Sequence, residues 1–497
     1  MKHAVALLAI LATACSTMEP KLGRPQPSIP ASWPVGSPYL AQSEAGLPAV
    51  TYKQIFTDPR LQELIAQALV NNRNLMAAAS NIAAAREQYR IEHAQQFPQL
   101  TSQAGVTASD NKNGSNSSSG SGSGSSGSVV ANYTLGLGVP SFELDLFGRL
   151  RSLTRAQFEQ YLATEAGARA TRLTLVADIA SSWLDYAADS SLLLVSQETV
   201  RSAQDSVRLT RLRLEGGIAP RTDLSQAQEI LNQAQASLAQ QRTQVAQDIN
   251  ALQLLVGAPI STALLPASIE QASPTVAELP AGLSSYVLLR RPDVVQAEYQ
   301  LRAANADIGA ARAALFPKIT LTGLLGFASS ALSGLFTGGL GWSVGANAAY
   351  TIFNAGAGRA NVRLTEAQRN AALASYQHTV QTAFREVSDA LARRATMDEQ
   401  LAATERQQAA AADVLALEEA RYRAGIDAFL NVLDAQRSYY AVQQTLVNTR
   451  RTAAQNRVTL YQSLGGDSLI ENSPLCSVDY VGNGGNATLA TDCSKTA

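Results

Sequence analysis

The chain carries one apolar pattern twice, 208 residues apart. Apolar residues recur every seven positions in both copies: Leu224, Leu231, Leu238, Val245 and Leu252, then Val432, Tyr439, Leu446, Ala453 and Leu460. Each copy begins after a glycine turn, at Gly217 and at Gly425, and ends on Gly257 or Gly465. A sustained seven-residue period indicates helices that supercoil around each other. A duplicated unit of this kind predicts a long tube or rod and not a compact catalytic globule.

The duplication divides the 497 residues into two similar halves with terminal extensions. We expect a helix at 58–96, a very long helix at 150–214 and a third at 220–255, with the same plan repeated in the second half. The predicted organisation is a signal peptide at 1–14, an N-terminal arm at 15–57, a first repeat at 58–257 with strands 99–108 and 129–147, a connector at 258–283, a second repeat at 284–466 with strands 318–328 and 341–353, and a tail at 467–497.

Charge and histidine content exclude several function classes. The formal net charge is −1, which gives no general attraction to polyanions, so no nucleic-acid partner is expected. The mature chain keeps two histidines, His93 and His378, each alone on a helical stretch without nucleophile or metal-ligand spacing around it. We therefore predict no catalytic residues, no metal site and no cofactor, and conclude that the chain is not an enzyme.

The first residues have the pattern of an export signal. Lys2 and His3 precede a short apolar run that is too short to span a bilayer. Small residues directly before Cys15 resemble the bacterial lipobox, in which the cysteine becomes the lipidated first residue. An ordinary signal peptide with an incidental cysteine is the alternative. In an oxidising periplasm, Cys476 and Cys493 of the tail could pair, although two free thiols are an equal alternative.

Each half also contains two segments in which apolar residues alternate with small or polar ones. The apolar positions of the four segments include Val106, Leu137, Leu325 and Trp342. Lipid on one face and water on the other would produce this pattern in a membrane barrel, whereas a soluble sheet packed on helices is the alternative. Four strands are too few to close a barrel, so several chains would share one. The parity changes at Pro140, which predicts a bulge there. A Gly/Ser tract between Ser109 and Ser128 predicts a loop.

Five short stretches match one family in order and spacing. They are Asn71-Asn72-Arg73-Asn74-Leu75, Phe142-Glu143-Leu144-Asp145-Leu146-Phe147-Gly148-Arg149, Leu289-Arg290-Arg291-Pro292-Asp293, Ala303-Ala304-Asn305 through Ala311-Arg312, and Tyr422-Arg423-Ala424-Gly425 followed by Val432-Leu433-Asp434-Ala435-Gln436. Together they resemble the TolC-type outer membrane factors, specifically the OprM- and NodT-like efflux lipoproteins. The resemblance implies a mostly α fold with a membrane β-barrel: a homotrimer with a shared twelve-stranded barrel and a periplasmic tunnel of coiled-coil helices.

The same resemblance implies where such a tunnel is gated. It places Asp434 at the narrowed lumen, with Asn431 where some relatives carry a second acid. It assigns Tyr422 to a tie between neighbouring helices, so that Tyr422→Phe should raise resting conductance. Arg421 and Arg423, beside that tyrosine, are expected to tie helices as well. A solvated coiled-coil position is the alternative for Asp434.

The resemblance further assigns the helix hairpin tips to adaptor binding. These tips are Gly216, Gly217 and Ile218 in the first half and Ala424, Gly425 and Ile426 in the second. The implied partners are a periplasmic adaptor protein, an inner-membrane pump and outer membrane lipid, in a Gram-negative bacterium. The implied function is export of small molecules such as drugs. Protein secretion and heavy-metal export remain alternative cargoes, and a coiled-coil scaffold without a channel is a further alternative.

Overall fold

The computed structural model describes residues 17–23, 29–30, 51–110, 129–277, 285–337, 339–466, 477–483 and 486–492. The chain forms two compact units. The first comprises Met1–Pro25, Ala83–Leu162 and Glu298–Ala374, and the second comprises Gln26–Ile82, Ala163–Ala297 and Ser375–Ala497. The predicted signal peptide, Cys15, Cys476, Cys493 and most of the Gly/Ser tract lie outside the described residues, so those predictions stay predictions.

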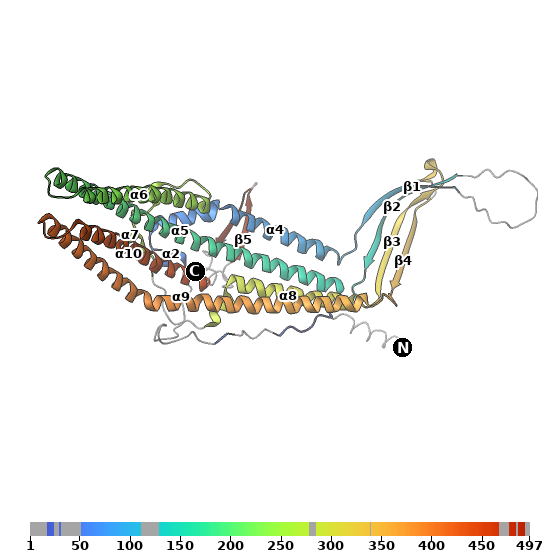
Figure 1. The fold of residues 1–497 in the computed structure, drawn as a ribbon. Coiled ribbons are helices and arrows are strands. Elements are labelled where there is room, and N and C mark those ends of the chain that lie inside the picture. Colours follow the sequence, from blue (N-terminus) through green and yellow to red (C-terminus); the bar gives the residue numbers. More distant parts are fainter. Residues whose placement is uncertain are drawn as a thin grey trace, which may run out of the picture. The chain divides into compact units, whose positions relative to one another are not determined.

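The first unit contains a four-stranded antiparallel sheet in the order β1-β2-β3-β4 (Figure 1). The strands are β1 (Thr101–Asp110), β2 (Val129–Glu143), β3 (Lys318–Ser329) and β4 (Gly341–Ala349). The pairing of β2 with β3 joins the two sequence repeats in one sheet. The predicted strands at 129–147 and 341–353 were too long. After β2 the chain turns, because Asp145 accepts a hydrogen bond from the Arg151 backbone N–H and Gly148 adopts a φ of 75°.

Strand register brings the apolar positions of the sheet onto one face. Leu137 pairs with Ser102 on one side and with Leu325 on the other, and Leu325 also pairs with Trp342. Apart from Leu324, the pairs of the opposite face bring small and polar residues together: Gln103 with Gly136, Gly136 with Gly326, and Thr322 with Gly345. The β2–β3 register shifts between Val139 and Phe142, as the parity change at Pro140 predicted. One face of the sheet therefore suits lipid and the other suits water.

Long helices make up most of the remaining structure. They are α5 (Arg149–Glu215), α6 (Arg221–Val256), α8 (Pro292–Ala313), α9 (Ala357–Arg423) and α10 (Phe429–Ser463), with shorter elements α2 (Tyr52–Ile55), α3 (Pro59–Asn71), α4 (Arg73–Ala94), η1 (Thr262–Leu264), α7 (Ile269–Ala272), η2 (Ser273–Thr275), η3 (Ser285–Arg290) and η4 (Leu332–Gly334). None of the helices in the described residues is long and apolar enough to cross a bilayer.

The single helix predicted at 58–96 is wrong, because the chain breaks at Asn72. The Asn72 side chain accepts a hydrogen bond from the backbone N–H of Leu75 at 3.0 Å, which caps α4. Its amide group donates to the carbonyl of Leu255 at 2.7 Å, near the end of α6. Gly257 follows with a φ of 74°, and a Cβ there would lie 2.6 Å from the carbonyl oxygen of Asn71. The asparagine pair therefore fixes the junction between α3, α4 and α6.

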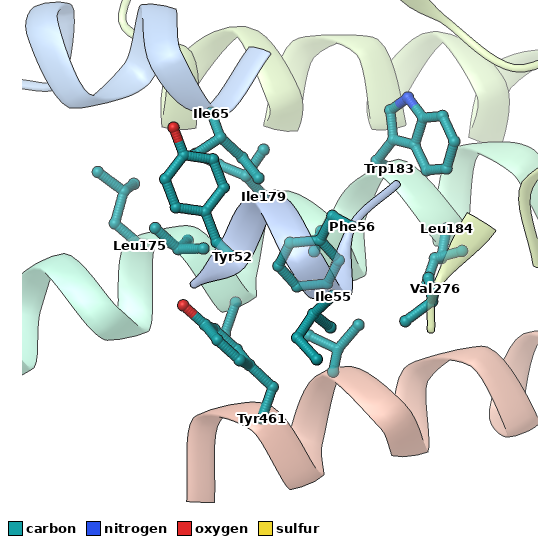
Figure 2. Close-up of a cluster of buried hydrophobic side chains, with 14 of the residues drawn as sticks. Tyr52, Ile55, Phe56, Ile65, Leu175, Ile179, Trp183, Leu184, Val276 and Tyr461 are labelled. Carbon is teal, nitrogen blue, oxygen red and sulfur yellow. The ribbon is translucent and has the colours of Figure 1, made fainter. Parts of the chain in front are cut away.

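The core of the second unit uses segments expected to be an arm and an irregular connector. Phe56 and Ile55, which end the arm, are fully buried beside Trp183 of α5 and Tyr461 of α10 (Figure 2). The rings of Phe56 and Tyr461 meet edge to face at 5.4 Å. Val276 of the connector forms a β-bridge with Phe56. Both segments therefore belong to the folded unit and do not merely link its parts.

The C-terminal tail also contains regular structure that the sequence reasoning missed. β5 (Ser477–Asn483) and β6 (Asn486–Asp492) pair as an antiparallel hairpin, with Asn483 opposite Asn486. The Gly/Asn composition suggested an irregular segment. The β-branched and aromatic residues Val478, Tyr480 and Val481 were the available signal for a strand.

Candidate functional site

The two long hairpins end in turns of the same conformation. At the end of α5 the Ile218 backbone N–H donates to the Arg213 carbonyl and the Gly217 N–H to the Leu214 carbonyl. At the end of α9 the N–H groups of Ile426 and Gly425 make the equivalent bonds, 208 residues later. This is a Schellman motif, and both glycines have the positive φ that it requires, 71° and 74°.

Both turns present an isoleucine to solvent. The side chain of Ile218 is 68% exposed and that of Ile426 is 65% exposed, and the neighbouring residues Gly216 and Ala424 are also exposed. In a Schellman motif the residue at this position commonly packs back onto its own helix. Here both isoleucine side chains are exposed instead, so they are available for contact with another molecule. The structure thus places the six predicted tip residues in two equivalent, solvent-facing turns.

Close to the turns, the α5–α6 hairpin packs on the α9–α10 hairpin through a small apolar cluster. Its buried members come from all four helices: Ala203, Val207, Ala227, Ile230, Tyr422, Phe429, Val432 and Leu433. Polar contacts continue the interface, because Gln436 of α10 donates to Ser206 of α5 at 3.1 Å. The cluster contains few large side chains, so the directional contacts beside it take a larger share in fixing the hairpins together.

The most specific of these contacts joins Arg213 to Tyr422. The Arg213 guanidinium carbon lies 4.5 Å from the centre of the Tyr422 ring, and an Nη1 donates to the Tyr422 carbonyl at 3.0 Å. The Tyr422 ring is buried against Phe429. Burial raises the pKa of Tyr422, and the nearby Arg213 charge opposes that shift. Its hydroxyl has no hydrogen-bond partner among the described residues, so the ring and the backbone make the tie.

Within one chain, Arg421 and Arg423 form only local ion pairs among the described residues, and the predicted ties to neighbouring helices stay a prediction. Arg421 forms an ion pair with Asp427, which the turn brings back beside it. Arg423 pairs with Glu419, one turn earlier on the same helix, at 2.8 Å. Arg213 makes the cross-hairpin contact in their place. Since Arg213 is the counterpart of Arg421 at the 208-residue offset, the sequence repeat was the signal that could have identified it.

Asp434 and Asn431 lie on the exposed face of α10, opposite its buried residues Val432 and Leu433. In the first repeat the position equivalent to Asp434 holds Gln226, which is also exposed. Of these two equivalent positions, only the one in the second repeat carries a carboxylate. No group of three or more potential metal-binding side chains occurs in the part of the chain that the structure describes.

Comparison with known proteins identifies the family. The family model described as "Outer membrane efflux protein" matches residues 64–258 and 283–466, more than half of the chain. The chain belongs to the outer membrane efflux protein family. Its most similar relatives include the antibiotic efflux pump outer membrane protein ArpC of Pseudomonas putida, which is 41% identical over 465 residues, 93% of this chain and 94% of ArpC.

Two further relatives agree with this assignment. The cation efflux system protein CusC of Escherichia coli is 36% identical over 462 residues, 92% of this chain and 98% of CusC. The solved open state of the Neisseria gonorrhoeae MtrE outer membrane channel is 33% identical, with a TM-score of 0.79 over 91% of this chain and 99% of that one.

These findings confirm that the protein is an outer membrane efflux channel of a Gram-negative bacterium. They also confirm the predicted fold class, in which duplicated long helices are combined with strands of a membrane β-barrel. The family consists of channels and not of enzymes.

Proposed function

We propose that three copies of this efflux channel form a gated duct that exports small molecules such as antibiotics. The apolar face that runs in register across all four strands carries the proposal, because it places the sheet in lipid. Unpaired strand edges cannot stay open in a bilayer, so β1 and β4 of each chain require neighbours. The name of ArpC supports antibiotics as cargo. Native mass spectrometry in mild detergent tests the stoichiometry, and a soluble monomer would contradict it.

The gate of this duct lies at the hairpin ends. Asp434 of each chain lines the narrow resting lumen, and the contact between Arg213 and Tyr422 holds the second hairpin against the first. Opening then requires the hairpins to break the small apolar cluster and the cation–π contact between Arg213 and Tyr422. The closed and open packings of such helices can differ in free energy by only a few kcal/mol.

A ring of Asp434 carboxylates should make the resting channel prefer cations. Asp434→Asn should lower the cation-to-anion permeability ratio in planar bilayers by roughly twofold to fivefold at low salt, and by less at high salt where the Debye length falls to about 3 Å. Gln226→Asp is the matched control, since it adds a carboxylate at the equivalent exposed position of the first hairpin. A ratio that changes with Gln226→Asp and not with Asp434→Asn would place the first hairpin at the lumen.

The two turns bind a periplasmic adaptor that couples the channel to an inner-membrane pump. Burial of one isoleucine contributes about 1.5–3 kcal/mol, so Ile218→Glu or Ile426→Glu should weaken adaptor binding by roughly tenfold or more. Cells carrying either variant should accumulate a fluorescent dye although the channel is present at normal amounts. Gln368→Glu, an exposed α9 position in the other unit, is the control. Normal dye export by both isoleucine variants would exclude the turns as the coupling surface.

Lipidation of Cys15 supplements anchoring by the barrel. Small residues precede this cysteine, and several acyl chains give stable attachment where one gives only marginal binding. The mass of the mature N-terminal peptide tests this, because an unmodified cysteine or a later start would contradict it.

A further inference from the structure

Two aspartates lie in the interior of the α5–α6 hairpin, away from the turns, with their side chains within hydrogen-bonding reach of each other. Asp189 of α5 and Asp248 of α6 are each only 8% exposed. The Asp189 carboxylate accepts a hydrogen bond from the Gln241 side chain at 3.0 Å, and Asp248 Oδ1 accepts one from Gln244 at 3.0 Å. Each acid thus receives one neutral donor from α6.

Neither Asp189 nor Asp248 forms an ion pair with any of the residues that the structure describes. Asp248 Oδ2 is buried and has no hydrogen-bond partner among the described residues. A third acid, Asp185, lies one turn before Asp189 on α5. The cation that α10 contributes, Arg451, lies 3.5 Å from Asp185, and Gln455 donates to the same Asp185 oxygen at 2.8 Å. Farther along α5, Glu270 of α7 bonds Ser191 and is itself paired with Arg450 of α10.

Two ionised carboxylates cannot both remain buried side by side, because each loses its hydration and repels the other. One added proton removes one of the two negative charges and so ends their repulsion. It also allows a hydrogen bond between Asp248 Oδ2 and the Asp189 carboxyl group. We propose that Asp189 and Asp248 share one proton, and that this proton joins α5 to α6 as part of the folded hairpin. The proposal does not depend on the position of the gate.

The titration of Asp248 falls near neutral pH. Burial, and then the adjacent Asp189, raises the pKa of Asp248 to about 7. An unfolded aspartate ionises near pH 3.9, so between about pH 4 and pH 7 the folded chain binds the extra proton and the unfolded chain does not. Protonation therefore stabilises the folded hairpin at low pH, and this stabilisation is lost as the pH rises through about 7.

Infrared difference spectroscopy of the purified full-length channel, titrated from pH 5 to pH 9, tests the shared proton directly. The carbonyl stretch of a protonated carboxylic acid should disappear with a midpoint near pH 7. Asp248→Asn should abolish this band, and Asp189→Asn should move its midpoint to lower pH because the like charge is gone. Asp205→Asn, at an exposed carboxylate of the same helix α5, should leave the band unchanged.

A second measurement covers the case in which a variant alters the fold. The melting temperature of the helical circular dichroism signal should be higher at pH 5.5 than at pH 8 by a few degrees, about 2–5 °C. Asp248→Asn should remove that difference while keeping the wild-type spectrum. Absence of the infrared band in the wild type, or its persistence in Asp248→Asn, would overturn the proposal. Loss of the infrared band at pH 5 when K⁺ or Ca²⁺ is added would also overturn the proposal, because a metal cation would then occupy the site.

Discussion

Replacing Arg213 with glutamine should raise the resting open probability of the channel about tenfold. A partly desolvated cation–π contact contributes ~1–2 kcal/mol, and 1.4 kcal/mol changes an equilibrium by a factor of ten. The variant loses both the stack on Tyr422 and the hydrogen bond to its carbonyl. Single-channel recording of the purified protein, without adaptor, measures the effect. Arg208→Gln is the matched control, because Arg208 is an exposed arginine of the same helix that pairs with Asp205, three residues earlier.

Variants of Tyr422 separate this mechanism from the one that the sequence suggested. Tyr422→Phe keeps the ring and removes a hydroxyl without a partner in the described residues, so it should behave like the wild type. Tyr422→Ala should open the channel as Arg213→Gln does, and the double variant should add little, since both remove one contact. A large effect of Tyr422→Phe together with none of Arg213→Gln would instead indicate a hydroxyl contact made between chains.

The sequence predicted those features that follow from periodicity. The seven-residue repeat gave the long hairpins, and alternation gave four strands with one apolar face. The parity change at Pro140 located the register shift in β2. These signals are local, because the residue type at each position depends on whether that position faces lipid, water or another helix. The glycines at 217 and 425 likewise had to be turns, since few other residues adopt their positive φ.

Features that depend on distant partners were missed. The helix break at Asn72 requires the carbonyl of Leu255, 183 residues away, and helix-forming residues on both sides concealed it. The contact of Arg213 with Tyr422 joins residues 209 positions apart, so the sequence around either residue does not reveal it. The buried pair of Asp189 and Asp248 left no sequence signal, because aspartates on long helices are ordinarily solvated.

The motif Leu289-Arg290-Arg291-Pro292-Asp293 is one of the five stretches that carry the resemblance to the family, and the structure gives the reason for its second arginine. Arg291 is buried, and its guanidinium bonds Asp293 at 2.7 Å, Glu386 of α9 at 2.9 Å and the carbonyl of Ser463, the last residue of α10, at 2.8 Å. One planar group with five donors thus joins the start of α8 to two other helices. It also satisfies a carbonyl at a helix end that would otherwise lack a partner.

Arg291→Ala should therefore destabilise the second unit by ~2–3 kcal/mol. Removing one partner of a buried ion pair costs about 3–5 kcal/mol, and the lower value applies because Asp293 and Glu386 are more than one-third exposed. Loss of helical circular dichroism on heating in detergent measures the change. Arg291→Lys should be intermediate, since an ammonium group cannot serve three acceptors in a planar fork. The adjacent, exposed Arg290→Ala should melt like the wild type. Equal melting of the Arg290 and Arg291 variants would show that the three-way contact contributes nothing to the stability of this unit.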